Sequence, residues 1–348
     1  MSESIVQEKI NSVLALFSKG NLEETLDLTS QLTIDHPNEP ILFNIQGACY
    51  AGLTNYKEAI KSYEMAIAIN PNYAKAYFNL AGTLHEMEKL EASVKAYKMA
   101  LKIEPENEAA LNNLGNVYQD LKEHHKAIDC YKKATSIKHD YVEAHYSAGL
   151  VFQDLGQLDS MISHIKKVLT IKPDFVEAHN NLGIAFKRNG QLDDAILSYK
   201  NALLIQPNNI EVHNNLGNVY KEKGLIDEAI NSYKAALKIN PNLPLLNINL
   251  GNALKELDLL DDAMASYEKA INIDSNNAEA YNNLGTVLEN LGKLNTSQIY
   301  YKKAIALNSN FAEAYNNLGT NLEQQGKLKD AQINYEKAIL INPGLANA

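Results

Sequence analysis

The stretch AEAYNNLGTVLENLGKL occupies residues 278–294, and the nearly identical AEAYNNLGTNLEQQGKL occupies residues 312–328. Repetition at a fixed interval is the mark of a repeat architecture. The glycine of NNLG recurs every 34 residues along the chain, at Gly115, Gly149, Gly183, Gly217, Gly251, Gly285 and Gly319. The interval extends backward through Ala81, Gly47 and Val13, which gives ten units between residues 6 and 345.

Other positions of the 34-residue unit also keep their residue type when the glycine is numbered 8. Position 24 is tyrosine in eight units, from Tyr63 to Tyr335, and position 27 is alanine in the same eight. Position 20 is small in most units, as in Ala59, and position 32 is often proline, as in Pro71 and Pro207. Positions 4, 7, 8 and 11 are apolar or small, which is the spacing of one helical face.

Two helices fit this pattern in each unit. Glycine at position 15, as in Gly292, can adopt the left-handed conformation that ends a helix. Proline at position 32 cannot donate a helical hydrogen bond and ends the second helix. A single helix pair cannot bury its own apolar face, so neighbouring pairs are expected to stack on a continuous core.

The residues at positions 8, 20, 24, 27 and 32 closely resemble the tetratricopeptide repeat family along almost the whole chain. The resemblance implies an all-α fold, an α-solenoid wound as a right-handed superhelix of about ten helix-turn-helix repeats, with the first helices lining its concave side. We therefore expect a single array over residues 1–348, in which residues 40–345 form nine repeats and residues 346–348 begin a further helix.

Two units depart from the pattern. Residues 6–39 place Lys9, Ser12 and Val13 where the aromatic residue, leucine and glycine are expected, which predicts a degenerate N-terminal capping repeat. Residues 142–175 carry larger side chains at positions 20 and 27 and lack the tyrosine, with Met161, Ile165 and Val168 in those places. This second departure indicates either a local bend or neutral drift.

Composition excludes several classes of partner and compartment. The 32 basic and 42 acidic residues give a net charge of −10, which disfavours nucleic acid. No apolar run is long enough to span a bilayer, so we expect no membrane association. The first residues lack the pattern of a signal peptide, and two cysteines make no disulfide framework, so a cytoplasmic location is expected.

No catalytic motif stands out, and we expect a protein that is not an enzyme and holds no cofactor or metal. His145, His179 and His213 form a series only because all three occupy position 4 of their repeats. Half-buried packing is expected for them rather than metal binding. Cys49 and Cys130 also occupy packing positions and are expected to be inert thiols.

Asparagines on the first helices give the best indication of function. Position 6 is Asn79, Asn113, Asn181, Asn215, Asn249, Asn283 and Asn317, and position 5 adds Asn112, Asn180, Asn214, Asn282 and Asn316. Positions 2, 5, 6, 9 and 12 share the helix face opposite the packing stripe. Their amides, standing free in a groove, could bond the backbone of an extended peptide. The alternative is that one ancestral unit was duplicated together with its asparagines.

The position-6 asparagines also resemble those in the repeat arm of the O-linked N-acetylglucosamine transferase family, which holds substrate polypeptides by their backbone. That resemblance implies a binding role for the same asparagines, although no glycosyltransferase domain follows. The leading hypothesis is a scaffold that binds proteins or peptides in extended conformation. Its alternatives are the substrate-recruiting arm of a transferase whose catalytic part lies elsewhere, and a scaffold that polymerises end to end. Some members of the tetratricopeptide repeat family bind the C-terminal carboxylates of chaperones through basic residues on the first helices. Here position 5 is not basic and position 2 is often glutamate, which disfavours that kind of binding.

Two apolar features complete the expectations. Leu245 and Ile248 stand where neighbouring repeats have glutamate and asparagine, and they could seat side chains of a partner. At the C-terminal end, Ile333 and Ala338 are expected to leave an apolar surface uncovered. Either the natural protein continues, or this end serves self-association.

Overall fold

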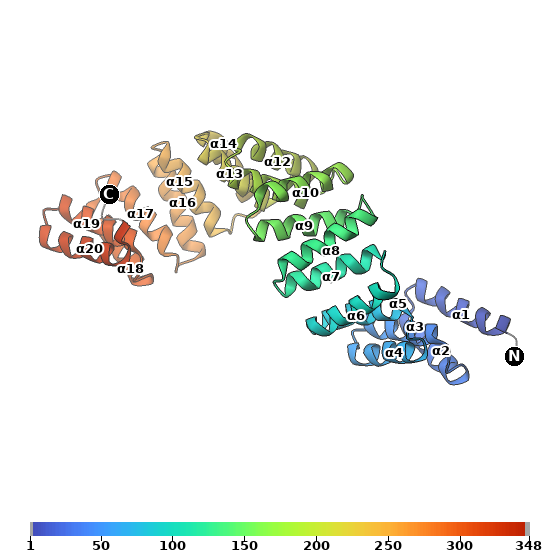
Figure 1. The fold of residues 1–348 in the computed structure, drawn as a ribbon. Helices are drawn as coiled ribbons and strands as arrows, with labels where there is room; N and C mark the ends of the chain where they lie inside the picture. Colours follow the sequence, from blue (N-terminus) through green and yellow to red (C-terminus); the bar gives the residue numbers. More distant parts are fainter. Residues whose placement is uncertain (1–2, 345–348) are drawn as a thin grey trace. The chain divides into compact units, whose positions relative to one another are not determined.

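The computed structural model describes residues 3–344, and within that range it contains twenty α-helices and no strand. The chain divides into two compact units, residues 1–173 and 174–348 (Figure 1). In each unit every helix packs against the next one along the chain. The expected all-α fold of stacked helix pairs is thereby confirmed.

The first unit contains ten helices, each of 13 to 16 residues. They are α1 (Glu3–Ser18), α2 (Leu22–Asp35), α3 (Pro40–Gly52), α4 (Tyr56–Ile69), α5 (Ala74–Glu86), α6 (Leu90–Ile103), α7 (Glu108–Asp120), α8 (His124–Ile137), α9 (Val142–Asp154) and α10 (Leu158–Ile171).

The second unit repeats the same plan with helices of 13 and 14 residues. They are α11 (Val176–Arg188), α12 (Leu192–Ile205), α13 (Ile210–Glu222), α14 (Ile226–Ile239), α15 (Pro244–Glu256), α16 (Leu260–Ile273), α17 (Ala278–Asn290), α18 (Leu294–Leu307), α19 (Ala312–Gln324) and α20 (Leu328–Ile341).

Glycine at position 8 lets the two helices of a repeat approach each other closely. A Cβ built on Gly115 of α7 would lie 2.5 Å from Cε1 of Tyr131 on α8, well inside van der Waals contact. Tyr131 is fully buried. The ring therefore occupies the space that a side chain at Gly115 would need. In the atypical repeat at 142–175, Ile165 fills the same place beside Gly149.

Every repeat after the first turns between its two helices through a residue with positive φ at position 15. Five of these nine are glycines, such as Gly292 at φ 72°. The other four are Thr54, Glu88, Lys122 and Asp258, with φ between 56° and 60°. The turn therefore keeps its backbone conformation even where the residue is not suited to it.

The last repeat is uncovered, but not at the residues expected from the sequence. Ala338 is buried. Ile333 is 54% exposed, yet its counterpart Ile299 in the preceding repeat is 67% exposed, so neither marks the end. The residues that lose cover are Leu328 and Ile339, because both are exposed while the equivalent side chains one repeat earlier are not.

Candidate functional site

The residues predicted for the groove lie on the first helix of each repeat, but they differ in exposure. The position-6 side chains are half-buried at Asn79, Asn113, Asn181, Asn215, Asn249 and Asn317 and buried at Asn283. The position-5 side chains are buried at Asn112, Asn180 and Asn282 and half-buried at Asn214 and Asn316. Leu245 is 59% exposed, whereas Ile248 is only 1% exposed. Position 5 is therefore more enclosed than position 6.

Side-chain amides join consecutive repeats at these two positions. The Nδ2 group at position 6 donates to the Oδ1 atom at position 5 of the preceding repeat. Four pairs form this bond: Asn79 to Asn44 at 2.9 Å, Asn215 to Asn180 at 3.1 Å, Asn249 to Asn214 at 3.0 Å and Asn317 to Asn282 at 3.0 Å. Burial of these polar groups is tolerated because each finds a partner in the adjoining repeat.

Glutamate at position 2 completes the connection in the second unit. Asn180 Nδ2 donates to Glu211 Oε1 at 2.9 Å, and Asn282 Nδ2 donates to Glu313 Oε1 at 3.3 Å. One position-5 asparagine thus bonds both the Glu and the Asn that lie four residues apart on the next first helix. We call this arrangement of Asn(5), Glu(2) and Asn(6) the amide bridge.

Where position 5 is not asparagine, the bridge changes. Ile248 occupies position 5 before Asn283, and Asn283 Nδ2 instead donates to Asn252 Oδ1 at 3.1 Å. Asn252 Oδ1 also accepts from the hydroxyl of Tyr267 at 2.7 Å. Position 9 therefore takes over as acceptor when position 5 offers none.

These contacts correct two expectations from the sequence. In four pairs, the position-6 Nδ2 group and the position-5 Oδ1 atom bond each other across repeats, so these groups do not stand free in a groove. Ile248 cannot seat a partner's side chain, because it is buried between helices. The sequence reasoning failed because it considered one helix at a time, whereas these positions face the next repeat.

One polar atom of each of the four Asn–Asn pairs remains available. The Oδ1 atoms of Asn79, Asn215, Asn249 and Asn317 accept no hydrogen bond from any described residue, while their Nδ2 groups are held by the preceding repeat. A carbonyl oxygen fixed in this way is a ready acceptor for a backbone N–H. We call the face formed by positions 2, 5, 6, 9 and 12 of the first helices the inner face.

A hollow of about 490 Å³ lies on the inner face of the second unit. Asn252, Lys255, Glu279, Asn283 and Glu313 contribute polar groups to it, from three successive first helices. Burial lowers the pKa of Lys255, against the opposing effect of the Glu313 carboxylate. The inner face therefore offers both charges and amides at one place.

The structure assigns roles to tyrosines and asparagines that the sequence analysis did not pair. Hydroxyls at position 24 donate to Oδ1 atoms at position 9: Tyr131 to Asn116 at 2.8 Å and Tyr233 to Asn218 at 2.8 Å. Buried tyrosine hydroxyls usually require such a partner. The spacing of 15 residues between the two positions is a signal that a search for recurring polar pairs would have found.

The histidines at position 4 support the loops between repeats. The Nε2 atom of His145 lies 3.1 Å from the carbonyl oxygen of His139, and that of His213 lies 2.9 Å from the carbonyl oxygen of Pro207. Both side chains are half-buried, as expected. No cluster of three potential metal ligands occurs within residues 3–344.

The two cysteines are buried and unpaired. Burial raises the pKa of the Cys49 and Cys130 thiols to about 11, so both are protonated at neutral pH. A protonated thiol is a poor nucleophile.

Of the described helices, none is long and apolar enough to cross a membrane.

Comparison with known families identifies the repeats directly. Models described as TPR repeat match residues 53–87, 82–122, 188–224, 217–258 and 260–292. Models described as tetratricopeptide repeat match residues 108–141, 142–175, 278–311 and 312–345. The chain belongs to the tetratricopeptide repeat family.

Individual relatives match only in part. The peroxisomal targeting signal receptor of Saccharomyces cerevisiae is 29% identical over 68 residues, which is 20% of this chain and 11% of the receptor. Two crystal structures of MamA each match 48% of this chain, at 29% and 26% identity and TM-scores of 0.44 and 0.47, and cover 98% and 92% of those chains. YrrB, a TPR protein with an unusual peptide-binding site, matches 54% of this chain and 96% of its own at 24% identity and a TM-score of 0.49.

Proposed function

We propose that this chain is a protein-binding scaffold that holds extended polypeptide segments along its inner face and performs no catalysis itself. The observation that carries the proposal is the row of Oδ1 atoms at position 6, one in each of several repeats, that are held in place and accept no bond from the described residues. A repeated acceptor of this kind suits the regularly spaced N–H groups of an extended chain. It would read little of the side-chain sequence.

The proposal is tested by two double variants that break the same hydrogen bonds from opposite sides. A peptide ligand is first selected from a library of unstructured peptides. Asn215→Ala with Asn249→Ala removes the two acceptors and should weaken peptide binding about tenfold, because two hydrogen bonds are lost. Asn180→Ala with Asn214→Ala breaks the same inter-repeat bonds but keeps the position-6 asparagines.

Calorimetric titration with that peptide separates binding from stability. Both double variants should unfold at lower denaturant concentration than the parent, since both lose the bonds between repeats. The position-6 variant should lose much more affinity, because the position-5 variant keeps both acceptors and loses only the bonds that hold them in place. Equal affinity in the two variants would mean that the asparagines serve the stack alone, as expected if they were merely inherited with each duplicated unit.

The same inner face would serve the substrate-recruiting arm of a transferase, such as one resembling the O-linked N-acetylglucosamine transferases. The position-6 asparagines favour this alternative for the same physical reason. It requires a catalytic partner, so a purified complex should transfer a labelled sugar to a substrate peptide. A complex that binds the peptide without transfer would leave only the general scaffold.

We also propose that a second copy of the chain packs on α19 and α20. Leu328 and Ile339 are exposed there, and Tyr335 is only half-buried although Tyr301 in the preceding repeat is fully buried. The Asn316 side chain has no partner among the described residues, whereas Asn282, one repeat earlier, bonds both Glu313 and Asn317. A second copy of the chain carries glutamate at position 2 and asparagine at position 6, which are the groups that bond the equivalent Asn282.

Sedimentation velocity over a range of concentrations tests this association. Leu328→Lys with Ile339→Lys should keep the protein monomeric where the parent dimerises. Ile333→Lys is the matched control, because its equivalent in the preceding repeat, Ile299, is exposed as well. A parent that stays monomeric at the highest concentration rules the association out.

We further propose a cytoplasmic location, since Cys49 and Cys130 are unpaired thiols. Cell fractionation that recovers the protein outside the cytoplasm would contradict it.

A further inference from the structure

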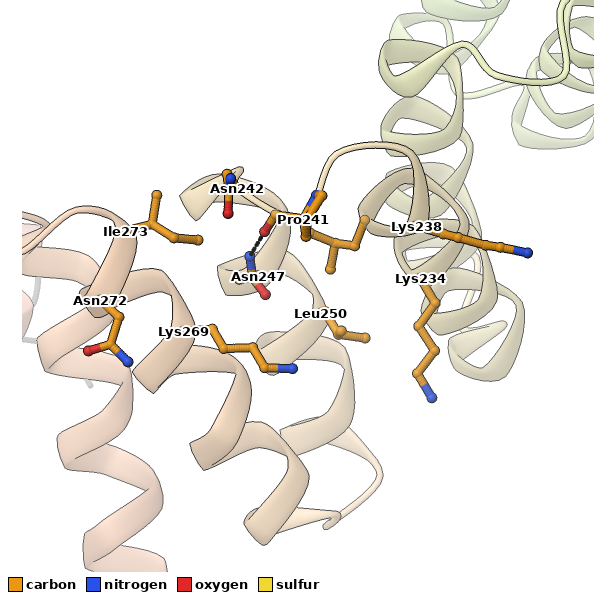
Figure 2. Close-up of a pocket in the computed structure, with 10 residues that line it drawn as sticks. Lys234, Lys238, Pro241, Asn242, Asn247, Leu250, Lys269, Asn272 and Ile273 are labelled. Carbon is orange, nitrogen blue, oxygen red and sulfur yellow. Dashed lines mark hydrogen bonds between the residues drawn. The ribbon is translucent and has the colours of Figure 1, made fainter.

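A second hollow, of about 520 Å³, lies between α14 and α16, away from the inner face, with α15 as its floor. Leu237, Leu250 and Ile273 supply apolar surface, and Lys234, Lys238 and Lys269 stand at its edges. Figure 2 shows Lys234 and Lys269 extending from opposite walls, whereas the side chain of Lys238 points away from the hollow. The volume lies within the range of about 300–1,000 Å³ that is usual for ligand pockets.

Asn247, at position 4 of its repeat, is one of the residues that shape the hollow. Tyr77, Tyr281 and Tyr315 occupy this position in other repeats. Asn247 is 3% exposed, and its Nδ2 group turns toward the chain, 3.4 Å from the carbonyl oxygen of Pro241 and 3.0 Å from that of Leu243 (Figure 2). The short side chain is thus held back, and the space that a tyrosine ring would fill stays open.

Charge distinguishes this hollow from its counterpart in the first unit. The equivalent hollow between α6 and α8 includes the carboxylate of Asp129. Its Lys98 and Lys126 lie over the ring of Tyr118, at 5.8 and 5.4 Å from the ring centroid. No carboxylate lines the hollow at Asn247.

The three lysines around Asn247 form no ion pair with any described residue. The rest of the chain is acidic, with a net charge of −10, so this is a local region of uncompensated positive charge. Lysine side chains beside an apolar surface select a ligand that carries negative charge and an apolar group.

We propose that this hollow is a second protein-binding site, which accepts an acidic segment of a partner carrying one large apolar side chain. The apolar side chain enters the space beside Asn247 and rests on Leu237, Leu250 and Ile273. Carboxylates on either side of it meet Lys234 and Lys269. The site is independent of the inner face, because none of its residues is on the inner face.

Two variants at one position test the shape of the site. The probe is a short capped peptide with one phenylalanine among glutamates, titrated calorimetrically into the full chain at low salt. Asn247→Tyr introduces the residue that the following repeat has at position 4, Tyr281, and fills the hollow, so the affinity should fall about tenfold or more because the peptide's ring can no longer be buried there. Asn247→Ala removes the same amide but leaves the space open, and should keep the affinity within about twofold.

Charge is tested separately. Lys234→Glu with Lys269→Glu should abolish binding, whereas Lys238→Glu, which alters charge on the same helix, should have the smaller effect. Raising the salt concentration should weaken binding by the parent. Equal binding by the parent and Asn247→Tyr overturns the proposal, as does equal binding of a peptide with lysines in place of glutamates. No measurable binding at millimolar peptide overturns it as well, and leaves the inner-face proposal untouched.

Discussion

Thr54 shows how strongly the fold imposes the conformation of a single residue. Its φ of 60° lies in the left-handed region, where a β-branched side chain is strained by about 1–2 kcal/mol. Its side chain is exposed, so its replacement removes few packing contacts. Thr54→Gly should therefore raise the free energy of unfolding by about 1 kcal/mol, measured by urea denaturation. Gly292→Thr should lower it, and a gain in both variants would contradict the explanation.

Ser147 is a second residue at which the fold predicts an improvement. It stands at position 6, where most repeats have asparagine, and the Oδ1 atom of the preceding Asn112 is buried without a partner. Ser147→Asn should supply the missing donor and stabilise the first unit by about 1 kcal/mol. Thermal unfolding of the Ser147→Asn variant measures the effect, with Ser147→Ala as the control. An unfolding midpoint equal to that of the parent would show that the bridge does not form there.

At the scale of the element, we expect two histidines on α9 and α10, His145 and His164, to make stability depend on pH. Burial, followed by the charges of His145 and Lys132, lowers the pKa of His164 from 6.5 to about 4. Burial also lowers the pKa of His145, against the opposing effect of the hydrogen bond to the His139 carbonyl oxygen. The folded state then binds fewer protons than the unfolded state, so stability is lost as the pH falls from 6.5 toward 4.

The measurement is the melting temperature of the protein between neutral and acid pH. His164→Ser places at this position the residue found at Ser198, Ser232 and Ser266, and should make the melting temperature less dependent on pH. An equally steep dependence in the variant would assign the acid sensitivity to other groups.

The sequence predicted the elements well and their mutual contacts poorly. Residue types that recur at fixed positions of every repeat predict the period of 34 residues, the tyrosine at position 24 and the close approach of helices at Gly115. The amide bridge instead depends on residues from two repeats, so no single helix reveals it. The hollow at Asn247 also went unnoticed, because the substitution of a tyrosine by an asparagine matters only through the helices around it.

At the scale of the whole molecule, the chain divides into two compact units of similar size. In repeat proteins each repeat contacts its neighbours, and the division between the units falls between Pro173 and Asp174. Residues 1–173 and 174–348, expressed separately, should each be helical by circular dichroism and unfold cooperatively. A fragment that is unfolded at room temperature would show that its stability depends on the rest of the chain.

The amide bridge has a consequence for how such a chain can change in length. One copy of the 34-residue unit encodes both halves of the junction: within residues 210–243, Asn214 receives Asn249 of the following repeat, while Glu211 and Asn215 bond Asn180 of the preceding one. An unequal recombination that adds or removes a whole unit of this kind therefore brings a matching junction with it. Lengthening the array needs a single genetic event and no compensating substitution. Duplication of the unit that contains Ile248 would instead copy a junction without the position-5 asparagine.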